Sequence, residues 1–123
     1  MVNLDGSADD ISIKLIDFGL SRQKEDIMTP SMCTYMWMAP EMTDKHHYDE
    51  KCDVYSYGVI LHELLFCQTP FKSSNMKTLL DEKKALSFNT PASEVAADLM
   101  YVKMWTLMKN CLAFDKKDRL SFE

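Results

Sequence analysis

The residues best suited to chemistry stand where a predicted strand stops. From Ile11 to Ile16 apolar side chains alternate with polar ones, the pattern of a half-buried strand. The next three residues, Asp17-Phe18-Gly19, break that pattern with an acid, an aromatic ring and a glycine. An aspartate at a strand end has a well-held carboxylate, and a glycine lets the chain turn away from it. Taken alone, the triplet is also what a plain turn would contain.

Two other groups of residues could in principle hold a metal ion. His46-His47 with Cys52 contains the right side chains, but adjacent residues rarely point at one ion and a fourth ligand is missing. His62-Glu63 opens like the helix motif of zinc proteases, yet the position of the second histidine is occupied by Phe66. We therefore expect no metal site at either place.

The sequence contains four cysteines, Cys33, Cys52, Cys67 and Cys111. We predict reduced and mostly packed thiols at these positions, not disulfides or zinc ligands.

Composition places the chain among globular domains and limits its partners. Its 123 residues are 46% hydrophobic and 27% charged, which is typical of one soluble domain. The net charge of −5 comes from dispersed acids, so no basic stripe favours nucleic acid or a membrane surface. No apolar run approaches the ~20 residues of a membrane span, and the N-terminus lacks the features of a signal peptide. We expect a cytoplasmic protein with neither nucleic acid nor membrane as partner.

The elements that must position these residues are mainly helical. Val2 and Leu4 pair with the strand at residues 11–16 in a predicted hairpin, and residues 20–34 are predicted to form a long surface loop. Helical spacing then predicts helices over 53–66, 76–86 and 93–112. We expect Ser93 to cap the third of these helices.

The first helix is apolar on nearly all sides, which is typical of a helix in the middle of a larger structure. We expect its face at Tyr57, Ile60 and Leu64 to be partly open to water or to a partner. Aggregation, or dependence on another chain, is the expected consequence.

Four motifs in a fixed order resemble one family. After the D-F-G triplet come "CTYMWMAPE" (33–41), "DVYSYG" (53–58) and "CLAFDKKDRLSF" (111–122). This series resembles the protein kinase catalytic domain, and most of all the tyrosine-kinase-like group of serine/threonine kinases. The resemblance covers nearly the whole chain. It implies a mainly α (α+β) fold: a partial C-terminal lobe with a short β-hairpin, an activation segment and three main helices.

The resemblance also implies a division of the chain and roles for single residues. Residues 1–19 would be the hairpin and D-F-G, 20–41 the activation segment, and 42–123 the helical lobe. Asp17 would bind the Mg²⁺ of ATP, Phe18 would pack inward, and Gly19 would act as the hinge. Thr34 matches the substrate-positioning threonine of serine/threonine kinases, and the activation-loop phosphorylation candidates are Thr29 and Ser31.

Two further roles are structural in the family. Glu41 and Arg119 match a buried ion pair that ties the activation segment to the lobe. Asp53 matches the helix-start aspartate that holds the backbone of the catalytic loop, and it can serve the helix dipole at the same time.

Several parts of a kinase active site are missing from these 123 residues. There is no Gly-rich loop, since the only glycines are Gly6, Gly19 and Gly58. There is also no H-R-D-x-x-x-x-N catalytic loop, because neither Arg22 nor Arg119 follows a histidine. We expect weak or no binding of ATP and Mg²⁺ and no catalysis by this chain alone.

Three interpretations remain open at this stage. In the first, the chain is the C-terminal part of a serine/threonine kinase and works with the missing N-terminal half on a protein substrate. In the second, it is a non-catalytic, kinase-derived module that binds a kinase or a substrate and regulates it. In the third, it is the product of a decayed or mispredicted gene and has no function.

Overall fold

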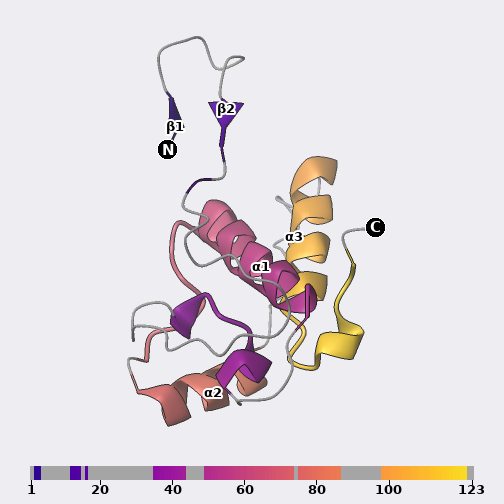
Figure 1. Cartoon of the computed structure of the whole chain (residues 1–123). Helices are drawn as coiled ribbons and strands as arrows, with labels where there is room; N and C mark the ends of the chain where they lie inside the picture. Colours follow the sequence, from indigo (N-terminus) through magenta and orange to yellow (C-terminus); the bar gives the residue numbers. More distant parts are fainter. Residues whose placement is uncertain are drawn as a thin grey trace.

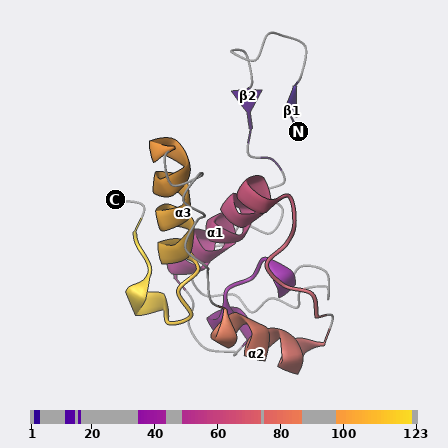
Figure 2. The same cartoon turned by 180° about the vertical axis from the view of Figure 1, so that it is seen from behind.

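The computed structural model describes residues 2–3, 12–14, 16, 35–43, 49–73, 75–86 and 98–121. This part of the chain is mainly helical, as the sequence predicts. The elements are β1 (Val2–Asn3), β2 (Ser12–Ile13), η4 (Pro40–Thr43), α1 (Lys51–Phe66), α2 (Met76–Ala85), α3 (Leu99–Cys111) and η6 (Lys116–Asp118). Helix α1 lies in the middle, with α3 beside it and α2 at the end away from the strands (Figures 1 and 2).

The two strands form a minimal antiparallel ladder. Val2 lies opposite Ile13 and Asn3 opposite Ser12. The connection over residues 4–11 lies outside the described residues, so the complete hairpin stays a prediction. The ladder is set apart from the helices in both views (Figures 1 and 2).

The core forms where α1 crosses α3. Gly58 in α1 makes this crossing close, because a Cβ atom there would lie 2.7 Å from Cys111 Cβ and 2.9 Å from Leu112 Cγ. Segments before, between and after the helices add the remaining apolar side chains. The buried cluster consists of Ala39, Cys52, Tyr55, Val59, Leu61, Phe71, Leu79, Met108 and Leu112.

Helix α1 has one buried face and one exposed face. It begins at Lys51, two residues before the predicted start, where the Asp49 carboxylate accepts a hydrogen bond from the Lys51 N–H at 3.1 Å. The predicted open face is confirmed within this chain, since Tyr57, Ile60 and Leu64 are 40%, 47% and 67% exposed. These positions repeat at helical spacing, so they form one apolar stripe along α1.

The start of the third helix corrects one prediction. Asp98, not Ser93, caps it: the Asp98 carboxylate accepts from the N–H groups of Met100 at 2.8 Å and Tyr101 at 3.2 Å. The backbone at Asp98 is extended, so α3 cannot run through it from residue 93. Ser93 itself lies outside the described residues. Asn75 caps α2 in the same way as Asp98 caps α3.

The described cysteines are free, as expected. Cys52 and Cys111 are buried, and burial raises the pKa of both thiols, that of Cys52 to about 12. Cys67 is exposed and lies just past the end of α1 in a left-handed conformation, with φ 53°. Cys33 lies outside the described residues. None of the described helices is long and apolar enough to cross a bilayer.

Candidate functional site

The predicted site residues fall into two groups. Asp17, Phe18, Gly19, Thr29, Ser31 and Thr34 lie outside the described residues, and their roles stay predictions. Glu41, Asp53 and Arg119 are described. Glu41 lies in the segment of residues 35–43, which follows Thr34 directly, and Arg119 binds this segment through Glu41. The way this segment is held is therefore the part of the site that the structure describes.

Glu41 and Arg119, 78 positions apart in the sequence, are in direct contact. Arg119 Nη1 donates to Glu41 Oε1 at 2.6 Å, and Nη2 donates to Oε2 at 2.8 Å. The Arg119 side chain is fully buried, whereas that of Glu41 is 20% exposed. Two parallel bonds between a planar guanidinium and a carboxylate make the strongest and most directional kind of ion pair. The pair fastens η4 to the C-terminal end of the chain.

Arg119 has a complete set of further partners. Its Nε donates to the Ala113 carbonyl at 2.8 Å, Nη1 to the Lys51 carbonyl at 3.0 Å, and Nη2 to the Phe114 carbonyl at 3.0 Å. Its Cζ lies 4.9 Å from the centroid of the Tyr55 ring, within cation–π range. One side chain thereby joins η4, the start of α1 and the segment after α3.

Helix α1 holds the same segment from a second direction. The Trp37 indole N–H donates to Glu63 Oε2 at 3.1 Å, and the Ser56 hydroxyl donates to the Trp37 carbonyl at 2.8 Å. Ser56 and Glu63 are seven residues apart, so they lie on the same face of α1. The backbone and the side chain of Trp37 are thus both fixed.

Helix α2 supplies a third attachment through Lys83. Its ammonium group donates to the Tyr35 carbonyl at 2.7 Å and to the Met38 carbonyl at 2.5 Å. Lys83 is only 2% exposed, and its Nζ lies 5.4 Å from the Tyr55 ring centroid and 5.3 Å from that of Phe71. Burial lowers the pKa of Lys83 to about 8, the nearby Glu41 carboxylate raises it, and Arg119 lowers it further.

Asp53 lies in the first turn of α1 with an exposed side chain. Its carboxylate accepts a weak hydrogen bond from the Cys52 thiol at 3.8 Å. The position of Asp53 in the first turn is that expected of an acid that stabilises the start of a helix. Its binding to the backbone of a catalytic loop stays a prediction.

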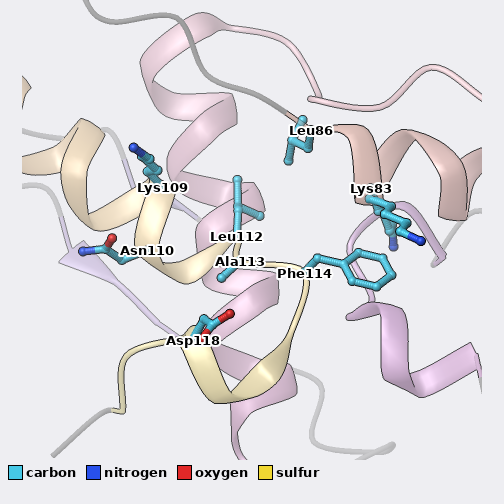
Figure 3. Close-up of a pocket in the computed structure, with 9 residues that line it drawn as sticks. Lys83, Leu86, Lys109, Asn110, Leu112, Ala113, Phe114 and Asp118 are labelled. Carbon is cyan, nitrogen blue, oxygen red and sulfur yellow. The ribbon is translucent and has the colours of Figure 1, made fainter.

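A pocket of about 480 Å³ lies between α2 and the end of α3 (Figure 3). Its lining includes lysines 84 and 109 as well as Asp118. Phe114 extends toward Lys83 along one side of it (Figure 3). Within the described ranges, no cluster of three or more His, Cys, Asp or Glu side chains could hold a metal ion.

Sequence reasoning missed Lys83, and one signal could have found it. Lys83 follows Leu79 by four residues, so it stands on the apolar face of a predicted amphipathic helix, where a charge is unusual. The hydrogen bonds of Trp37 and Ser56 had no comparable signal, since neither residue type indicates a partner 26 or 19 positions away in the sequence.

Comparison with known proteins agrees with this geometry. Residues 2–123 match the family model described as the protein kinase domain. The chain belongs to the protein kinase family. It is 39% identical over 119 residues, or 94% of the chain, to the mitogen-activated protein kinase kinase kinase dlk-1 of Caenorhabditis briggsae. It is 35% identical over 112 residues, or 85% of the chain, to serine/threonine-protein kinase 33 of Mus musculus.

This kinase chain corresponds to only part of each relative. The matched region spans 13% of the length of dlk-1 and 23% of serine/threonine-protein kinase 33. Serine/threonine-protein kinase STY46 of Arabidopsis thaliana is 45% identical over 62 residues, which is 49% of the chain and 11% of that protein. All three relatives are protein kinases by name, two of them serine/threonine kinases, and all are much longer than this chain.

Proposed function

We propose that this chain is the C-terminal part of the catalytic domain of an ATP-dependent serine/threonine protein kinase of the tyrosine-kinase-like group. The single observation that carries the proposal is the bidentate Glu41–Arg119 pair. It joins the A-P-E motif to the arginine near the C-terminal end, and these belong to two of the four motifs whose order resembles the family. The names of two relatives, serine/threonine-protein kinases 33 and STY46, and the position of Thr34 support serine or threonine as the acceptor residue.

We assign the proposed roles to residues in the order in which they occur in the sequence. Asp17 at the end of its predicted strand would bind the Mg²⁺ of ATP, and that metal would neutralise charge on the transferred phosphoryl group. Phe18 and Gly19 would set the direction of the Asp17 carboxylate. Thr34 and the 35–43 segment would hold the protein substrate near its acceptor hydroxyl, with Thr29 or Ser31 as the site of an activating phosphorylation.

We further propose that these 123 residues do not catalyse phosphoryl transfer alone. A single carboxylate leaves Mg-ATP without its remaining protein contacts, since Mg²⁺ relies on one or two carboxylates together with substrate phosphates and water. The loss of a general base costs about 10²- to 10⁴-fold in rate. The upstream half of a kinase domain would supply that base, and we propose a cytoplasmic location for the assembled protein.

The test compares the isolated chain with a completed domain. The purified chain is incubated with radiolabelled ATP and casein, and we expect no label above that of an Asp17→Ala control. Residues 2–123 are then fused behind the upstream half of the dlk-1 kinase domain. We expect the folded fusion to label serine or threonine and its Asp17→Ala variant to lose the activity. Label from the isolated chain that Asp17→Ala removes would contradict the proposed inactivity, and a folded but inactive fusion would contradict the kinase function.

A second candidate is a non-catalytic binding module, which the exposed apolar stripe at Tyr57, Ile60 and Leu64 favours. An upstream coding sequence distinguishes the two candidates. An in-frame H-R-D-x-x-x-x-N before Met1 supports the kinase, whereas an in-frame stop codon supports a short binding product.

A further inference from the structure

Lys83 occupies a position that is costly for a charge. Its side chain is buried between the rings of Tyr55 and Phe71, and no carboxylate of the described residues lies within ion-pair distance of it. Taking an ammonium group out of water without a counter-ion costs free energy, and two hydrogen bonds to carbonyls offset that cost only in part. A gain in overall stability is therefore a poor explanation for this lysine.

The contacts of Lys83 point instead to the backbone that it binds. Its two acceptors, the carbonyls of Tyr35 and Met38, are three residues apart on the segment that follows Thr34. Two bonds from one ammonium group fix both the place and the direction of this short backbone stretch. Trp37 lies between the two acceptors and is fixed by Ser56 and Glu63 of α1. Residues 35–38 are thus held between α1 and α2.

We propose that Lys83 is a positioning residue, whose ammonium group sets the backbone of residues 35–38 and thereby the place of the protein substrate. The structural half of this inference stands on the contacts alone. The half that concerns the substrate rests on the proposed function.

The first test removes the charge of Lys83 and keeps a side chain of similar volume. We expect Lys83→Met to lower the protection of the amides of residues 36–39 against hydrogen exchange by about tenfold or more, because it removes two charge-assisted bonds. We expect a smaller change in the midpoint of urea unfolding than in the local exchange, because the desolvation cost of the ammonium group disappears together with its two bonds. Lys84→Met is the matched control, because Lys84 is the exposed neighbour on α2. Unchanged protection of residues 36–39 in folded Lys83→Met would overturn the proposal.

A second measurement uses the unmodified chain, so it holds even if Lys83→Met does not fold. The charged or titratable groups around Lys83 are Glu41 of η4, Arg119 after η6 and Tyr55 of α1, and across the neighbouring pocket lie Lys84, Lys109 and Asp118. When residues 35–38 open, the Lys83 pKa returns from about 8 to its ordinary 10.5. The open state then binds more protons between these two values, so raising the pH makes opening rarer, by up to about tenfold per pH unit. A pH dependence confined to residues 35–38, after correction for intrinsic exchange, would show that Lys83 leaves its site when this backbone opens, whereas the same pH dependence in segments that do not contact Lys83 would overturn the proposal.

Kinetic measurements on the complete kinase separate this inference from the proposed function. In the complete kinase we expect Lys83→Met to raise the KM for the protein substrate and to leave the KM for ATP unchanged. An inactive complete protein would refute the proposed function, while both exchange measurements still decide the role of Lys83. An active Lys83→Met protein with altered exchange and an unchanged substrate KM would overturn the link to the substrate.

Discussion

Arg119 is the residue with the most partners in the described part of the chain. Its buried guanidinium binds the Glu41 carboxylate and three backbone carbonyls, so removing it leaves four groups without their donor. Breaking a buried pair from one side costs about 3–5 kcal/mol, against a typical total of about 5–15 kcal/mol. We therefore expect Arg119→Ala to unfold most of this lobe in urea melts followed by circular dichroism.

Glu41→Ala separates the ion pair from the rest of that network. The Arg119 guanidinium keeps its three carbonyl acceptors in this variant, whereas Arg119→Ala leaves four groups without a donor, so we expect a smaller loss than for Arg119→Ala. Lys117→Ala is the control, because Lys117 is an exposed neighbour of Arg119. Near-unchanged melting of both Arg119→Ala and Glu41→Ala would refute a stabilising role for the pair.

At the scale of elements, the close contact of α1 with α3 depends on Gly58, which has no side chain. Gly58→Ala would gain up to about 1 kcal/mol of helix propensity. The added Cβ would meet Cys111 Cβ at 2.7 Å, which is part of the α3 framework and not a flexible side-chain tip. Overpacking of this kind costs about 1–3 kcal/mol, so we expect a net loss in free energy of unfolding, measured in urea.

Ile60→Ala is the comparison for Gly58→Ala. It changes an exposed position of the same helix and should shift stability by no more than about 0.5 kcal/mol. A Gly58→Ala chain that is more stable than the original would mean that helix propensity outweighs the close crossing.

How far the sequence predicts these elements depends on whether their signals are local. Periodicity placed α1 and α2 within two residues of their observed bounds, because the core face repeats at helical spacing. The start of α3 was wrong because Ser93 and Asp98 are both good capping residues, and only the folded backbone shows which one has the extended conformation. Lys83 was missed for a related reason, since its acceptors lie 45 and 48 positions away in the sequence.

The site follows the same rule. Glu41 and Arg119 could be paired in advance only through motifs that resemble a family, as nothing local links residues 78 positions apart. Trp37 and Ser56 also stand in such motifs, but no role that the resemblance implies pairs them with each other or with Glu63. Their hydrogen bonds therefore needed the structure.

At the scale of the whole molecule, the exposed stripe on α1 should govern behaviour in solution. Ile60 and Leu64 are 47% and 67% exposed, and contiguous apolar surface of this kind favours association. A net charge of −5 gives only modest repulsion between copies at neutral pH. We expect the isolated chain to associate with increasing concentration in sedimentation velocity.

Two double variants test whether the apolar stripe or the low net charge causes this association. Ile60→Glu with Leu64→Glu removes apolar surface and makes the net charge more negative by two. Lys72→Ala with Lys77→Ala makes the same change in charge at exposed polar positions and leaves the stripe intact. We expect only the first pair to yield a monomer, because association then depends on apolar contact and not on net charge. If both variants became monomeric to the same extent, repulsion between copies would be the controlling force, and the stripe on α1 would not be the surface through which the chains meet.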